Sequence, residues 1–106
     1  MSVKRRFTKH DISQFCYEGR VWARAQNTTL ISKLWALCPN GSWMAWYLYE
    51  KHAVTFNETQ VLAHEMGIVW TFTGRTADNL HASKEVQKAF ADLLRTRFTS
   101  TGRARK

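Results

Sequence analysis

The sequence predicts a mainly α protein, a compact single domain of four or five helices, with room for one short extended segment or hairpin near residues 68–73. Apolar residues recur at helical spacing in several stretches of the chain. Helix-capping residues precede most of these stretches. The chain has 106 residues, 44% of them hydrophobic and 23% charged, so it can bury a core and is not disordered throughout.

The first helix is predicted to begin after Thr8, with Asp11 at its third position, where a carboxylate suits the helix dipole. Apolar residues then follow one helical face: Ile12, Phe15, Cys16, Gly19, Trp22 and Ala23. Gly19 on this face either weakens the helix or lets a neighbouring element approach closely. Residues 26–29 interrupt the pattern and precede a second helix that carries Leu30, Ile31, Leu34, Trp35, Leu37 and Cys38.

Residues 39–42, Pro-Asn-Gly-Ser, form the strongest turn signal in the chain. Two interpretations fit this turn. The Asn-Gly pair closes a β-hairpin, or the turn ends one helix and Ser42 caps the next. The apolar run Trp43–Tyr49 that follows has neither a period of 2 nor one of 3.6. We favour a helix because Leu, Met and Ala dominate this region and β-branched residues are scarce.

A short helix is predicted at 58–66. Asn57 is its expected cap, and Gln60 is placed to reach back in a capping box. Gly67 supplies the left-handed residue that ends the helix, and Ile68 is placed for the accompanying hydrophobic contact.

The best strand candidate is the segment 68–73, which is β-branched and aromatic and lies between Gly67 and Gly74. A strand needs a partner, and the sequence offers the aromatic run near Trp46.

The segment 62–68, Leu-Ala-His-Glu-Met-Gly-Ile, resembles the first helix and turn of a helix-turn-helix motif. The second helix of such a motif would begin near Thr76 and expose Arg75, Asn79, His81 and Lys84. Residues 54–83 carry more acidic than basic side chains, which disfavours contact with phosphates. We therefore prefer the simpler interpretation, a capped helix that ends at Gly67.

Ser83 is predicted to cap the last helix, whose apolar face holds Val86, Phe90, Leu93, Leu94 and Phe98. The chain is thus divided into a basic N-terminal arm at 1–7, a globular helical domain at 8–98, and a flexible basic tail at 99–106.

The net charge is +8, from sixteen basic and eight acidic residues. Residues 1–10 contain four basic residues and no acidic one, and residues 84–106 contain seven basic and two acidic ones. Basic ends favour a polyanionic partner, nucleic acid before an anionic membrane surface or an acidic protein. The alternative is that the charge serves only solubility.

The residues predicted to contact phosphates are Lys4, Arg5, Arg6, Lys9, Arg95, Arg97, Arg103, Arg105 and Lys106. For Arg95 and Arg97, in the last turn of the final helix, the alternative is a favourable interaction with the helix dipole.

Five tryptophans, three tyrosines and six phenylalanines are many for a domain of this size. We expect three of the tryptophans to fill the core and part of the run 43–49 to remain exposed. Exposed aromatic residues mark a protein interface or a platform for base stacking. The predicted protein-interface residues are Trp43, Trp46, Tyr47 and Tyr49.

The sequence shows no catalytic or metal-binding motif. The four histidines are scattered, and His64-Glu65 lacks the second histidine of a zinc-protease helix. Cys16 and Cys38 form no metal-binding pair and are expected to be small core residues in a reducing compartment, although a bridge between them stays open. No catalytic residue, metal or cofactor is therefore expected, and the protein is expected to be cytoplasmic.

We expect a small non-enzymatic accessory protein that acts in nucleic-acid transactions and contacts phosphates through its basic ends. The alternative is a protein-interaction module that binds or inhibits a larger partner, such as a nucleic-acid enzyme, through its aromatic surface and basic arms. A role at a membrane surface ranks third, because no wide apolar face lies beside the basic segments.

Overall fold

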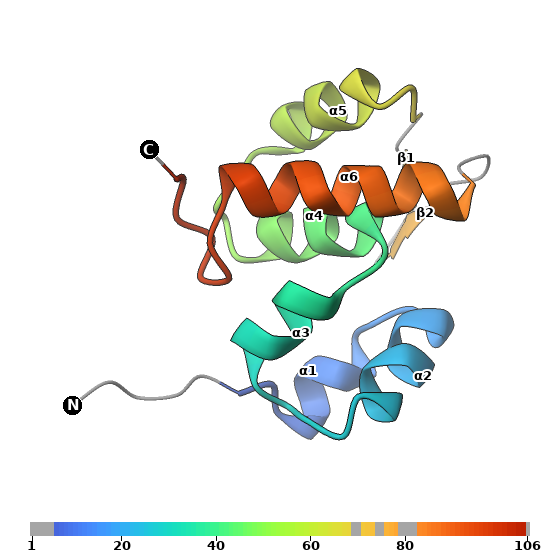
Figure 1. Cartoon of the computed structure of the whole chain (residues 1–106), viewed down its shortest axis with the longest axis vertical. Coiled ribbons are helices and arrows are strands. Elements are labelled where there is room, and N and C mark those ends of the chain that lie inside the picture. Colours follow the sequence, from blue (N-terminus) through green and yellow to red (C-terminus); the bar gives the residue numbers. More distant parts are fainter. Residues whose placement is uncertain (1–5, 69–70, 74–75, 79–82, 106) are drawn as a thin grey trace.

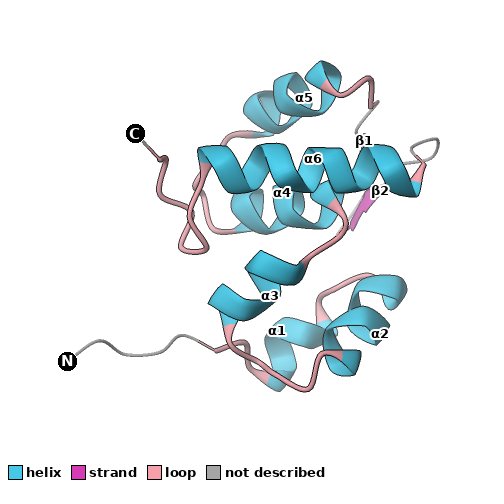
Figure 2. Ribbon diagram, viewed as in Figure 1, coloured by secondary structure: helices cyan, strands magenta, loops and turns pink. Residues whose placement is uncertain are grey.

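The computed structural model describes residues 6–68, 71–73, 76–78 and 83–105. Within these residues the chain is mainly helical, as predicted (Figure 1; Figure 2). The helices are α1 (Lys9–Ser13), α2 (Tyr17–Ala25), α3 (Ile31–Leu37), α4 (Gly41–Glu50), α5 (Phe56–Glu65) and α6 (Lys84–Arg97), and the strands are β1 (Thr71–Thr73) and β2 (Thr76–Asp78). None of the described helices is long and apolar enough to cross a membrane.

The prediction of one continuous first helix is wrong, because two helices occupy this stretch. Thr8 caps α1 as predicted, and its side chain and that of Asp11 bond each other's backbone N–H groups at 3.1 and 2.8 Å. The chain then leaves the helix, and Cys16 becomes the N-cap of α2 in an extended conformation. The break lets Phe15 pack on Trp46 of α4, a contact that helical periodicity does not reveal.

Helices α4 and α6 lie side by side at the centre of the molecule (Figure 1). Leu48, Phe90 and Leu94 are completely buried between them and their neighbours. Gly41 makes this contact possible, since an added Cβ would lie only 2.7 Å from the backbone nitrogen of Ala91. In Figure 1, α5 lies on one side of this pair, and α1, α2 and α3 lie on the other.

The run 43–49 is helical, which is the interpretation that we favoured from the sequence. The N-cap of this helix, α4, is Asn40 and not Ser42. The Asn40 side chain accepts a hydrogen bond from the Trp43 N–H at 3.2 Å. Ser42 lies inside the first turn, and its N–H donates to Oε1 of the buried Gln87 at 3.1 Å. This N–H is one of the backbone donors that a helix start leaves without an internal partner.

Helix α5 begins earlier than predicted, and Asn57 is not its cap. Thr55 is extended, its hydroxyl accepts from the Glu58 N–H, and the Glu58 carboxylate accepts from the Thr55 N–H. This reciprocal box shifts the start by two residues. The predicted end is confirmed, because Gly67 has a φ of 72°.

The predicted strand partner is wrong, because the residues around Trp46 belong to α4. Strand β1 pairs instead with β2 in an antiparallel hairpin, with Phe72 opposite Ala77. The second helix of the suggested helix-turn-helix is also excluded, since Thr76 begins β2. Residues 69–70, 74–75 and 79–82 lie outside the described residues.

Ser83 caps α6 as predicted, its side chain accepting from the Val86 N–H at 3.2 Å. Residues 99–105 fold back along the end of this helix, where the sequence predicts a flexible tail. The Thr99 N–H donates to the Arg103 carbonyl, and the Arg105 N–H donates to the Arg97 carbonyl, both at 2.8 Å. The C-terminal segment therefore has a defined path on the molecule.

Candidate nucleic-acid interface and the adjoining cavity

Tyr47 of α4 contacts residues near both ends of the described chain. Its ring meets the ring of Phe7 edge to face, with centroids 5.7 Å apart. Its hydroxyl donates to the carbonyl of Ser100 at 2.8 Å. Phe7 and Ser100, which are far apart in the sequence, are therefore both neighbours of Tyr47.

The three segments next to Tyr47 each carry exposed basic side chains. The N-terminal segment contributes Arg6, which is exposed and hydrogen-bonded to the Thr29 hydroxyl at 3.2 Å. The exposed Lys51 follows α4, and its ammonium lies 5.4 Å from the centre of the Tyr47 ring. The C-terminal segment adds Arg103 and Arg105, both exposed. We call these four residues the basic face.

The basic face holds little opposing charge. Over the segments 6–9, 47–54 and 98–105 the sequence has one acidic residue, Glu50. Lys9, at the start of α1, is exposed as well. The predicted residues Lys4, Arg5 and Lys106 lie outside the described residues.

Sequence reasoning missed Lys51, because nothing in its local pattern separates it from an ordinary surface lysine. Only its position over Tyr47 shows that it lies between the two ends. A second contact supports this placement, since a Cβ on Gly102 would approach Ala53 to 2.9 Å. The C-terminal segment thus packs on the turn that follows Lys51.

The Arg95 side chain forms hydrogen bonds within the fold and is not part of the basic face. Its guanidinium donates to the carbonyls of Trp35 and Cys38 at 3.0 and 2.8 Å, and to the Asp92 carboxylate at 2.7 Å. These bonds satisfy carbonyls at the end of α3 that the helix itself cannot pair. Arg95 thus lies in the last turn of α6, as predicted, and its guanidinium also bonds the carbonyls at the end of α3.

Arg97 lies at the end of α6, where it forms an ion pair with Glu65 of α5 at 3.0 Å. Both side chains are nearly half exposed, so the pair is screened by water and contributes little to stability. We leave Arg95 and Arg97 out of the basic face because each forms an ion pair with a carboxylate, that of Asp92 or that of Glu65.

The aromatic run predicted as a protein interface is partly buried. Trp43, Trp46, Tyr47 and Tyr49 all pack against the hydrophobic core and keep only part of their surface exposed. The role of this run in binding a partner protein stays a prediction.

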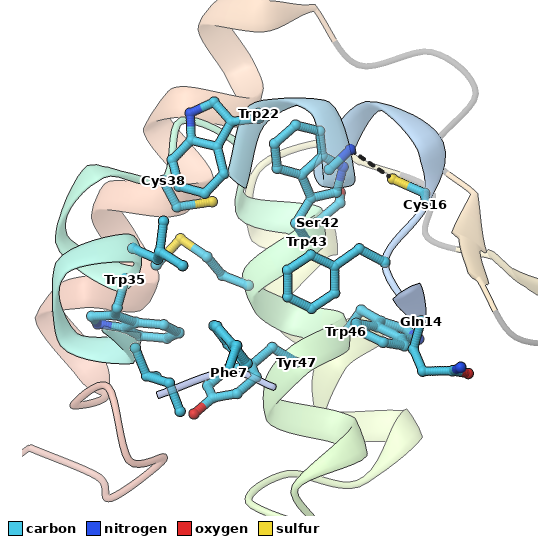
Figure 3. Close-up of a pocket in the computed structure, with 15 residues that line it drawn as sticks. Phe7, Gln14, Cys16, Trp22, Trp35, Cys38, Ser42, Trp43, Trp46 and Tyr47 are labelled. Carbon is cyan, nitrogen blue, oxygen red and sulfur yellow. Dashed lines mark hydrogen bonds between the residues drawn. The ribbon is translucent and has the colours of Figure 1, made fainter. Parts of the chain in front are cut away.

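Beside the basic face, α4 lines an apolar cavity of about 80 Å³. Figure 3 shows aromatic side chains from several elements around a common space. Trp43, Trp46 and Tyr47 come from α4, Trp35 comes from α3, and Trp22 comes from α2. Four of the five tryptophans of the chain thus line this one cavity.

The rings of the cavity wall contact one another at an angle rather than face to face. Trp22 and Trp43 have centroids 6.0 Å apart, and Phe15 and Trp46 have centroids 6.3 Å apart in an edge-to-face arrangement. Tilted and edge-to-face pairs are the stable geometries of aromatic rings. In these arrangements the paired rings do not stack flat on one another.

Two polar groups of the wall lack partners. The indole N–H groups of Trp35 and Trp46 are buried and have no acceptor among the residues that the structure describes. Buried indoles usually find an acceptor, because an unpaired buried donor costs stability.

The two cysteines are free and both line this cavity. Burial raises the pKa of the Cys38 thiol from 9.0 to about 11, against the smaller opposing effects of a hydrogen bond with the Asn40 backbone and of the Arg95 charge. Cys38 is therefore neutral at physiological pH and contributes no charge to the cavity.

Over the described ranges, no three histidine, cysteine or acidic side chains gather closely enough to hold a metal ion. Comparison of the chain with family models, curated proteins and solved structures finds no match.

Proposed function

We propose that the protein is a non-enzymatic accessory protein that binds the phosphate backbone of nucleic acid through the basic face. The observation that carries the proposal is the pair of contacts that Tyr47 makes, with Phe7 beside Arg6 and with Ser100 in the C-terminal segment. Two separate basic tails would each bind phosphates weakly, whereas a shared face presents its cations to adjacent phosphates of one strand or duplex.

The chemistry of the face fits phosphate better than base edges. Arginine donates from a planar fork that matches phosphate oxygens, and lysine acts as a point charge. Contacts of this kind fix position and affinity but carry no sequence information. We therefore expect binding with little sequence preference.

The test is binding of a fluorescein-labelled DNA duplex measured by anisotropy over a range of salt concentrations. For duplex DNA the logarithm of the association constant falls with the logarithm of salt by about 0.9 for each phosphate contact. We expect Arg103→Ala, Arg105→Ala and Lys51→Ala each to weaken binding and to reduce this slope by up to about 0.9.

The matched control is Lys84→Ala with Lys88→Ala. Both lysines are exposed on α6 and lie toward the end of that helix that is far from the C-terminal segment (Figure 1). This double variant lowers the net charge by two but should leave the slope nearly unchanged. Equal losses in the control and in the basic-face variants would show attraction by net charge alone, and no binding at low salt would overturn the proposal.

A further inference from the structure

The cavity beside the basic face has no role in phosphate binding. We propose that it is a binding site for a small uncharged aromatic molecule about the size of one ring. This inference stands apart from the proposed function, because none of the four cations of the basic face lines the cavity and the ligand has the opposite character.

The wall chemistry selects against charge. None of the residues that line the cavity is an acid, a lysine, an arginine or a histidine. A charged ligand would lose its hydration here without gaining an opposite charge, which is costly in an apolar setting. An uncharged ring loses only the unfavourable contact between its apolar surface and water.

The wall geometry favours a ring over a flexible aliphatic chain. Trp35 and Tyr47, which both line the cavity, are tilted by 54° with centroids 6.0 Å apart, so their rings lie in different planes around it. An aromatic ligand can meet these as stacked or edge-to-face partners. The sulfur atoms of Cys16, Cys38 and Met44 also belong to the lining, and polarizable sulfur packs favourably against aromatic rings.

The volume limits the ligand to a single ring. The cavity holds about 80 Å³, roughly half the ~150 Å³ of an engineered apolar cavity that takes up benzene. A ring is therefore only partly enclosed. Among the residues that line the cavity, Phe15, Cys16 and Trp22 are partly exposed, whereas Leu34 and Trp35 of α3 are buried.

The packing of the wall is incomplete without an occupant. Atoms that line an empty apolar space lose packing contacts that a ligand restores. A ring that enters this cavity therefore gains contacts with the apolar side chains that line it.

The direct test is a titration of the ¹⁵N-labelled full chain with toluene, followed through the indole N–H signals. Single Trp→Phe variants assign the signals of Trp22, Trp35, Trp43 and Trp46. We expect these signals to shift and to saturate with one common dissociation constant. Titration with benzoate, a ring of the same size that carries a charge, should produce no saturable shift.

A variant that fills the cavity makes the test specific. Gly19 lines the cavity, and a Cβ built on it meets the Cys16 sulfur at 3.3 Å, Phe15 Cβ at 3.6 Å and Trp43 at 3.9 Å. Gly19→Leu should therefore occupy the space and abolish toluene binding. Val21→Leu is the matched control, because Val21 is on the same helix and half exposed, and it should bind toluene like the wild type.

If Gly19→Leu fails to fold, Gly19→Ala replaces it, since its single methyl group fits with a small shift of the Cys16 side chain. We then expect toluene affinity to fall by about tenfold, while the indole spectrum stays that of a folded protein. The proposal is overturned if toluene causes no saturable shift in the wild type. It is also overturned if a folded Gly19 variant binds toluene as tightly as Val21→Leu does.

Discussion

At the scale of single residues, two buried glycines of the helices, Gly19 and Gly41, have different roles. Both begin or interrupt apolar helical stretches, yet only the tertiary structure shows what each one faces. Gly41 is pressed against the backbone of α6 at Ala91, whereas Gly19 faces side chains that can adjust.

We predict that Gly41→Ala destabilises the protein by about 1–3 kcal/mol, because overpacking forces α4 and α6 apart. Gly19→Ala should change the stability much less, since the higher helix propensity of alanine offsets the tighter contact. Urea unfolding followed by circular dichroism measures both variants. Equal stability of the wild type and Gly41→Ala would mean that the two helices do not approach this closely.

The buried thiol of Cys38 should make the free energy of unfolding depend on pH. Its folded pKa of about 11 lies above the unfolded value of 9.0, so the folded state keeps a proton that the unfolded state releases. The stabilisation is complete below pH 9 and is lost as the pH rises toward 11, by roughly 2–3 kcal/mol in total. Other groups titrate in this range, so the measured quantity is the difference in unfolding free energy between the wild type and Cys38→Ala. A difference that does not vary with pH would contradict this assignment.

At the scale of elements, the caps decide where the helices begin. The start of α5 illustrates this, because two capping candidates stand two residues apart. Thr55 has a carboxylate three positions later at Glu58, and the box it forms uses both side chains. Asn57 instead lies inside the first turn.

We predict that Thr55→Ala costs about 1 kcal/mol of stability, the usual loss on removing an N-cap side chain. Asn57→Ala should cost much less, because no cap bond depends on that side chain. Chemical unfolding of the two variants under identical conditions provides the comparison. The reverse order of losses would move the helix start back to the position that the sequence suggested.

At the scale of the whole molecule, Tyr47 is the residue on which the arrangement of the two ends depends. Its contacts reach Phe7 in one direction and Ser100 in the other. A change there should therefore loosen the C-terminal segment without disturbing distant helices.

Tyr47→Phe keeps the ring and removes the hydroxyl that donates to Ser100. We expect a loss of about 0.5–1.5 kcal/mol, the net value of an ordinary hydrogen bond. Amide hydrogen exchange should become faster at Thr99, Gly102 and Arg105, whose N–H groups hold the folded-back segment. Exchange in α5 serves as the internal control, and unchanged exchange at the C-terminal amides would count against the role of this tyrosine.

The local chemistry of the sequence determined most of the secondary structure. The caps Thr8 and Ser83, the left-handed Gly67 and the helical run after the turn at 39–42 follow from interactions over three to five residues, which sequence patterns record. The concentration of basic residues at the two ends is likewise a property of the sequence itself.

The tertiary structure decided how these parts are used. Tyr47 and Ser100 are 53 positions apart, and Arg95 and Trp35 are 60 positions apart, so no local pattern could pair them. The cavity likewise depends on tertiary packing, because its wall combines rings from three separate helices, α2, α3 and α4. Periodicity shows which face of a helix is apolar, but the packing of one helix on another decides which apolar residues close the core and which enclose a space.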